Sequence, residues 1–186
     1  LPKEHVQALR AVASVVHTLP IQGTWSDRCR RLVRLARWPS HVSSRIPSRQ
    51  ALQALWASLD AFRPEAVWLD AIYPIWLARA AARRYGVPMF YRSHNIEHRY
   101  MRGQVDRATS LRDRLAWSMN LPHLRRVEFD AWRQAEVVFD ISMDDLAWWR
   151  KQGFAQGVWL PPLVNPEKAR QLSGPLTQMP AFDVAY

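Results

Sequence analysis

Apolar positions in the first 48 residues change from helical spacing to alternation and back. Residues 2–12 place apolar side chains at helical spacing and predict a helix. Ser14–Leu19 alternates before a proline and predicts a strand. Asp27–Arg37 carries apolar residues among arginines, which predicts a short amphipathic helix that stops at Trp38 because the residue before a proline avoids the α region. A polar loop is expected from there through Ser48.

The central part of the chain alternates helices with short buried strands. Gln50–Phe62 has apolar residues on one helical face, and the apolar run Ala66–Leu69 that follows predicts a buried strand. The pattern returns with a helix over Pro74–Tyr85 and a strand over Met89–Arg92, separated by the break at Gly86–Pro88. Each of the two helices is therefore expected to lead into a strand.

A long helical pattern and one more helix–strand pair follow. Leu111–Ala135 has helical periodicity, although Pro122 should kink or interrupt the helix. The apolar run Glu136–Phe139 predicts another short strand. A Ser-x-x-Asp cap opens a helix over Ser142–Gly153, and Val158–Leu160 predicts the next strand.

This alternation of strands and helices predicts the fold class. Helices between strands favour an α/β fold with a doubly wound, Rossmann-like parallel sheet and helices on both faces. Three prolines end the alternation shortly after Leu160. We expect residues 1–162 to form one domain, residues 163–180 to be an interdomain linker, and residues 181–186 to begin a second domain.

The composition is that of a folded protein. Of 186 residues, 48% are hydrophobic and 23% are charged, which excludes disordered and collagen-like chains. The longest apolar stretch, residues 66–82, contains Asp70 and Arg79, so we expect no membrane-spanning segment. The first residues do not have the pattern of an export signal, and Cys29 is the single cysteine. A cytoplasmic protein without an internal disulfide is the expectation.

The chain carries a formal net charge of +10, almost wholly from arginine. Such a field attracts phosphate groups, so nucleic acid, an anionic membrane surface and sugar phosphates are all partners that the charge alone permits. Arginines on an ordinary solvated surface would give the same total. Charge therefore does not choose among these classes.

One polar segment comes directly after a predicted strand. Arg92-Ser-His-Asn-Ile-Glu97 follows the strand at Met89, so it lies at the carboxyl end of the sheet, where open α/β folds bind ligands. Asp70 and Tyr73 follow the neighbouring strand and should face the same crevice. Each side chain also has a structural interpretation, because strand-end aspartates, serines, asparagines and histidines often cap the next helix, and Arg92 has carboxylates nearby to pair with.

Four segments in succession carry a resemblance to a known family: Arg63-Pro-Glu-Ala-Val-Trp-Leu69, Tyr85-Gly-Val-Pro88, Arg92-Ser-His-Asn-Ile-Glu97 and Ala135-Glu-Val-Val-Phe-Asp-Ile-Ser142. In order and spacing, over about residues 50 to 165, the chain resembles family 4 of the retaining GT-B glycosyltransferases. The resemblance implies the N-terminal, acceptor-side half of a two-domain enzyme. It also implies that the family's glycine-rich loop lies before Leu1 and its pair of glutamates after Tyr186, so this chain alone should not turn over.

The resemblance assigns roles to the strand-end residues. His94 would be the catalytic residue and would hydrogen-bond the transferred sugar or the leaving phosphate. The substrate-binding residues would be Arg92, Ser93, Asn95, Asp70 and Tyr73. Arg92 and Asn95 would shape the cleft, and Asp70 and Tyr73 would meet the acceptor. The partners would be a nucleotide-sugar, bound mainly by the other half, and a glycan or lipid-linked acceptor. No metal or other cofactor is expected.

Two rival interpretations and one surface feature stay open at this point. His94-Asn-Ile-Glu-His98 has the spacing of an inverted zinc-protease motif, which needs a helix and a third, acidic ligand such as Glu128. The basic charge and the abundant aromatics permit a nucleic-acid-binding module, although no known motif of that class is present. Trp148 and Trp149, beside two basic residues, would suit either a lipid headgroup boundary or ordinary packing.

Overall fold

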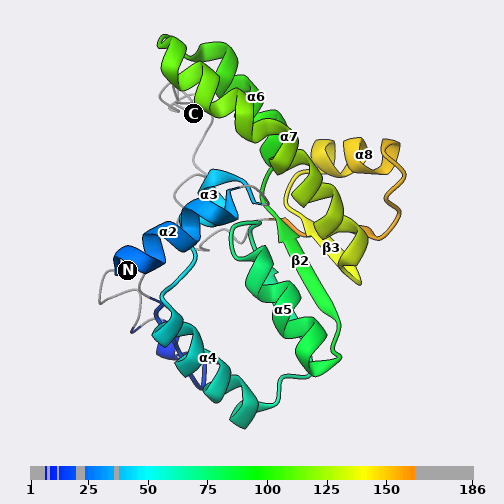
Figure 1. Ribbon diagram of the computed structural model, residues 1–186. Helices are drawn as coiled ribbons and strands as arrows, with labels where there is room; N and C mark the ends of the chain where they lie inside the picture. Colours follow the sequence, from blue (N-terminus) through cyan, green and yellow to red (C-terminus); the bar gives the residue numbers. More distant parts are fainter. Residues whose placement is uncertain (1–6, 8, 12, 20–23, 36–37, 162–186) are drawn as a thin grey trace, which may run out of the picture.

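A four-stranded, all-parallel sheet is the centre of the computed structural model, which describes residues 7, 9–11, 13–19, 24–35 and 38–161. The strands lie in the order β1-β2-β3-β4 along the sheet. Helices surround the sheet (Figure 1), so the predicted α/β class is confirmed, and the arrangement is consistent with a Rossmann-like, doubly wound fold. The strands are β1 (Val67–Asp70), β2 (Met89–Ser93), β3 (Val137–Asp140) and β4 (Gly157–Trp159).

The helices follow the predicted pattern over most of the chain, and α7 continues through Pro122 without ending there. A helix after the His94 segment, which the periodicity did not single out, forms as α6. The described helices are α2 (Trp25–Arg34), α3 (Ser40–Ser43), α4 (Arg49–Phe62), α5 (Ile75–Tyr85), α6 (Glu97–Arg107), α7 (Leu111–Gln134) and α8 (Met143–Lys151).

Two predictions near the N-terminus are wrong. Ser14–Leu19 forms no strand: Val15 is exposed, and His17 Nε2 instead contacts Ser58 Oγ on α4 at 2.7 Å. A strand inside a parallel sheet needs an apolar run buried on both faces, which this partly polar segment does not offer. The expected loop before Ser48 contains the short helix α3, because burial of Val42 in the core holds the backbone in a turn.

The core lies on the sheet face that carries Leu69 and Tyr91, beneath α7 and α8. Trp132 of α7 and Trp149 of α8 are fully buried and stack with ring centroids 4.6 Å apart. The backbone of β4 passes so close to these helices that a Cβ on Gly157 would lie 2.4 Å from the Leu146 side chain. Glycine at this position therefore permits the sheet to pack against α8.

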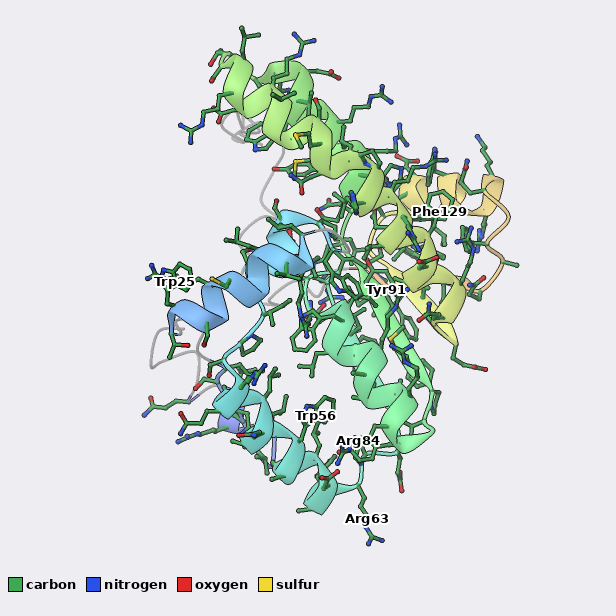
Figure 2. All side chains as sticks on the ribbon, viewed as in Figure 1. Trp25, Trp56, Arg63, Arg84, Tyr91 and Phe129 are labelled. Carbon is green, nitrogen blue, oxygen red and sulfur yellow. The ribbon has the colours of Figure 1, made fainter. Side chains whose placement is uncertain are left out.

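At the end of the sheet away from the candidate site, polar contacts join α4 to α5. Asp60 accepts hydrogen bonds from Arg84 Nη2 and from the Tyr85 hydroxyl, both at 2.7 Å. The Arg84 guanidinium also lies over the Trp56 ring, 5.4 Å from its centroid (Figure 2). The Tyr85 and Arg84 bonds lower the pKa of Asp60. This cluster joins the C-terminal half of α4 to the C-terminal end of α5.

The described part of the chain contains no helix with the length and apolarity needed to cross a bilayer. The predicted linker at 163–180 and the predicted start of a second domain at 181–186 lie outside the described residues. The domain boundaries stay predictions.

Candidate functional site

The strand ends bring together several of the residues predicted for the site. The parallel register pairs Asp70 with Arg92 and Ser93 with Asp140. Paired residues in a parallel sheet point to the same face, so Asp70 and Arg92 share one face and Ser93 and Asp140 share the other. The carboxyl ends of β1, β2 and β3 thus form one polar edge, as open α/β folds present to ligands.

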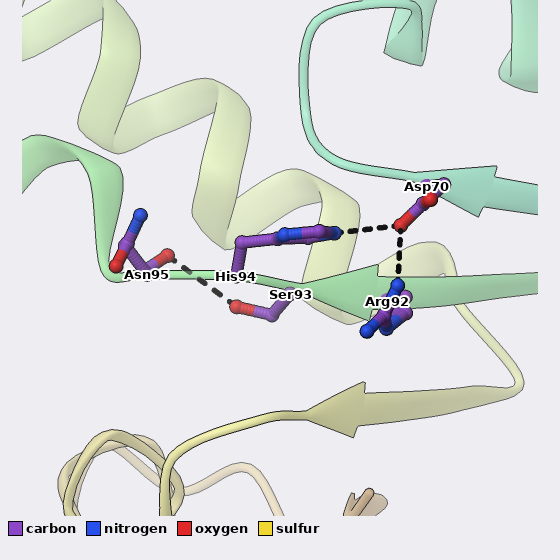
Figure 3. Close-up of polar contacts among 5 residues, drawn as sticks. All are labelled: Asp70, Arg92, Ser93, His94 and Asn95. Atoms are coloured by element: carbon purple, nitrogen blue, oxygen red, sulfur yellow. Dashed lines mark hydrogen bonds and ion pairs between the residues drawn. The ribbon is translucent and has the colours of Figure 1, made fainter. Parts of the chain in front are cut away.

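Asp70 is the centre of this edge. Its Oδ1 lies 2.6 Å from His94 Nε2 and 3.5 Å from Arg92 Nη1 (Figure 3). The side chains stay accessible, with exposed fractions of 55% for Asp70, 36% for His94 and 25% for Arg92. One carboxylate therefore orients an imidazole and a guanidinium that solvent, and hence a ligand, can reach. Asp70 is also one of the nearby carboxylates that the sequence offered as a partner for Arg92.

The backbone directly after Asp70 takes an unusual conformation. Ala71 has φ 64°, in the left-handed region that a residue with a Cβ rarely adopts. Its N–H donates to the carbonyl of Arg92 at 3.2 Å, which ties the turn after β1 to the end of β2. Such strain persists where the surrounding structure fixes the backbone, and it is common at functional sites. Here it sharpens the turn that presents Asp70 to His94.

The segment that carries His94 is held by one buried carboxylate, that of Glu128. Glu128, on α7 and 1% exposed, accepts from the backbone N–H of Glu97 at 2.7 Å and of His98 at 2.9 Å. The same carboxylate contacts His98 Nδ1 at 2.5 Å. The first N–H groups of a helix have no acceptor within the helix, so the Glu128 carboxylate both caps the positive N-terminal end of α6 and holds the segment before it.

Sequence reasoning gave Glu128 no role in holding the site. A signal for burial was present, because Glu128 falls on the same helical stripe as the buried residues Leu124, Val127 and Ala131. A glutamate on such a stripe needs a partner, since burying an unpaired charge is unfavourable. The sequence did not show that the partner is the N-terminus of α6.

Asp140 is a second residue that the sequence interpretation left out. It is fully buried at the end of β3, where its Oδ1 accepts from the Ser142 N–H at 2.9 Å. Oδ2 is buried and has no hydrogen-bond partner among the residues that the structure describes. Burial raises the pKa of Asp140 to about 6, although the Ser142 bond acts against this shift. The sequence did contain a signal for Asp140, because this aspartate ends a predicted strand just as Asp70 does.

The remaining predicted residues lie around this centre. Ser93 is buried and its hydroxyl donates to the Asn95 carbonyl at 3.4 Å, so its role here is to close the turn (Figure 3). Tyr73 lies beneath the Arg45 guanidinium, 4.1 Å from its ring centroid. Burial and the negative charge of Glu97 raise the pKa of the Tyr73 hydroxyl. Substrate binding by Ser93 and acceptor contact by Tyr73 stay predictions.

The zinc interpretation of His94–His98 does not fit the geometry. The helix begins at Glu97, so the pentapeptide is not helical throughout. His94 contacts Asp70 whereas His98 contacts Glu128, and within the described ranges no three His, Cys, Asp or Glu side chains gather as metal ligands. His98 also packs against aromatic rings, those of Phe129, Trp148 and Trp149.

Trp148 and Trp149 belong to this packing and do not form a lipid-facing pair. Trp149 is fully buried, and its ring meets that of Trp148 edge-on at 4.9 Å. Trp148 is partly buried against the core, and the Arg99 guanidinium lies 5.6 Å from its ring centroid. Of the two interpretations that the sequence allowed, the structure supports ordinary packing.

Comparison with known proteins gives no match. No family model, no curated protein and no solved structure corresponds to this chain. What the chain does must therefore be inferred from the strand-end geometry and from the motifs in the sequence.

Proposed function

We propose that this chain is the acceptor-side half of a retaining GT-B glycosyltransferase of family 4, with His94 as the catalytic residue. The observation that supports this most is the His94–Asp70 contact of 2.6 Å at the carboxyl end of the parallel sheet. The sheet position is where an α/β enzyme binds its substrates, and the imidazole is the side chain that the family resemblance assigns to the cleft.

His94 would act through the nitrogen that Asp70 leaves available. Asp70 engages Nε2, and no described residue hydrogen-bonds Nδ1. A neutral ring with its proton on Nε2 would accept a hydrogen bond from a sugar hydroxyl at Nδ1. A protonated ring would instead donate from Nδ1 to a phosphate oxygen, with Asp70 stabilising the imidazolium. Either state uses Asp70 as a positioning residue.

Arg92 and the capped segment would complete the acceptor side. The Arg92 guanidinium adds positive charge beside His94 and would attract a phosphate or an acidic acceptor. Because Glu128 holds the segment, His94 would need little rearrangement when substrate binds, which favours a preorganised site. The donor nucleotide-sugar would be held mainly by the other half of the enzyme, and the acceptor would be a glycan or a lipid-linked sugar.

The test is turnover by the protein encoded by the complete reading frame around residues 1–186. That protein, incubated with a panel of nucleotide-sugars and candidate acceptors, should release nucleotide diphosphate and give a product of retained anomeric configuration by NMR. Residues 1–186 alone should release none. Inversion at the anomeric carbon, or absence of release with every donor while the protein binds no nucleotide-sugar in calorimetry, would refute the proposal.

A further inference from the structure

The first half of α7 carries an apolar stripe that the described chain leaves uncovered. Leu111, Leu115 and Met119 are 83%, 65% and 69% exposed. They recur every four residues, so they lie on one side of the helix, one above the next. Exposed apolar residues scattered singly need no explanation, whereas a row of three on one helical face marks an interaction surface.

The opposite side of this helix faces the body of the protein. Asn120 is about half a turn round the helix from Leu111. Its Oδ1 accepts a hydrogen bond from the Ser40 N–H of α3 at 2.8 Å. Figure 1 shows the paired helices α6 and α7 extending beyond the sheet. The stripe is therefore directed away from the body, at the end of a projecting helical pair.

Exposed arginines border the stripe. Arg112 and Arg114 are exposed and, at 100° per residue, lie on its two sides. Arg125 and Arg126, also exposed, continue the same side of α7 beyond Pro122. Arg102 and Arg107 add positive charge on α6, in a chain whose formal net charge is +10. Arginine beside exposed leucine is the pattern of helices that lie in a membrane interface, where the guanidinium reaches the headgroups.

We propose that this face of α7, defined by Leu111, Leu115 and Met119 with Arg112 and Arg114, docks on an anionic lipid bilayer. A second copy of the chain fits this face poorly, because two such faces would bring their arginines together and the stripe is small for a stable dimer. Nucleic acid would match the arginines and leave the leucines unused. An anionic bilayer complements both parts, and this docking does not depend on the proposed glycosyl transfer.

The test is flotation of the full chain with vesicles. We expect binding to phosphatidylcholine vesicles that contain phosphatidylglycerol, little binding to pure phosphatidylcholine, and weaker binding as salt is raised. The double variant Leu111→Gln, Leu115→Gln keeps the charge and should weaken binding at least about tenfold. The matched control Phe62→Gln, Met143→Gln changes two residues that are 61% and 63% exposed elsewhere and should bind like the wild type.

Equal far-ultraviolet circular dichroism and equal melting temperatures for the two double variants establish that both are folded. Absence of wild-type binding to the anionic vesicles would overturn the proposal, as would unchanged binding by the Leu111, Leu115 variant. Light scattering supplies the third outcome: a dimer that this variant abolishes, without any lipid binding, would assign the stripe to a second copy of the chain.

Discussion

The imidazole Nε2 of His94 lies 2.6 Å from the carboxylate Oδ1 of Asp70 and so joins the segment after β2 to the end of β1. Both side chains are accessible to solvent, while two structural features hold the backbone on either side of the contact. Glu128 fixes the backbone at Glu97, three residues after His94, and the turn at Ala71 fixes Asp70. A reactive side chain at the surface of a rigid support is the arrangement that preorganised sites require.

Glu128→Ala should destabilise the protein by about 2–4 kcal/mol, because it leaves the N–H groups of Glu97 and His98 without their acceptor. Urea unfolding followed by circular dichroism measures the change. Glu136, an exposed glutamate just after α7, is the matched control, and Glu136→Ala should change the free energy of unfolding by no more than about 0.5 kcal/mol. Equal effects for the two substitutions would show that Glu128 does not hold the segment.

Asp140 should make the stability of the protein depend on pH. Burial raises the pKa of Asp140 from 3.8 to about 6, so the folded state favours the neutral carboxyl. The stability that the neutral carboxyl contributes is complete below about pH 4 and is lost as pH rises through about 6. Asp140→Asn does not titrate, so its stability relative to the wild type should rise between pH 4 and pH 8, by up to about 3 kcal/mol.

Urea unfolding of both proteins across this pH range measures the difference. Asp106→Asn, which changes an exposed aspartate on α6, is the control substitution at the surface. A difference between Asp140→Asn and the wild type that stays constant from pH 4 to pH 8 would contradict the assigned environment of Asp140.

Two glycines should respond to alanine in opposite directions. A Cβ at Gly157 would lie 2.4 Å from Leu146 and 3.0 Å from Trp132. Gly157→Ala should therefore lower the free energy of unfolding by about 1–3 kcal/mol and lower the melting temperature. Gly103 lies within α6 with nothing within 4 Å of its Cβ position, so Gly103→Ala should stabilise by about 0.5–1 kcal/mol. Thermal unfolding distinguishes the two, and stabilisation by Gly157→Ala would refute the packing of β4 against α8.

Periodicity in the sequence was sufficient to predict most of the fold. The helices α4, α5, α7 and α8 and the four strands appear where the sequence predicted them from apolar spacing and proline, and each of these elements contributes at least one buried residue to the structure. Ser14–Leu19 was misassigned, since alternation alone does not supply a neighbouring strand to pair with. The turn that became α3 depends on burial of Val42, a tertiary contact that local pattern does not encode.

The strand-end rule predicted part of the candidate site. The rule predicted that Asp70, Arg92 and His94 lie at one edge, because parallel strands end on the same side of a sheet, and the structure has them there. It did not reveal Glu128, which is 31 residues from Glu97 in sequence and meets it only when α7 packs beside α6. It also omitted Asp140, whose burial depends on the register between β2 and β3.

The most direct test of the central claim is the turnover number of His94→Ala in the complete enzyme. We predict that kcat falls by about 100-fold or more with little change in KM, because His94 would act mainly in the transition state. His17→Ala, which removes an exposed histidine that contacts Ser58 on α4, should keep wild-type kcat. Wild-type turnover by a folded His94→Ala enzyme would contradict the assignment of His94 as the catalytic residue.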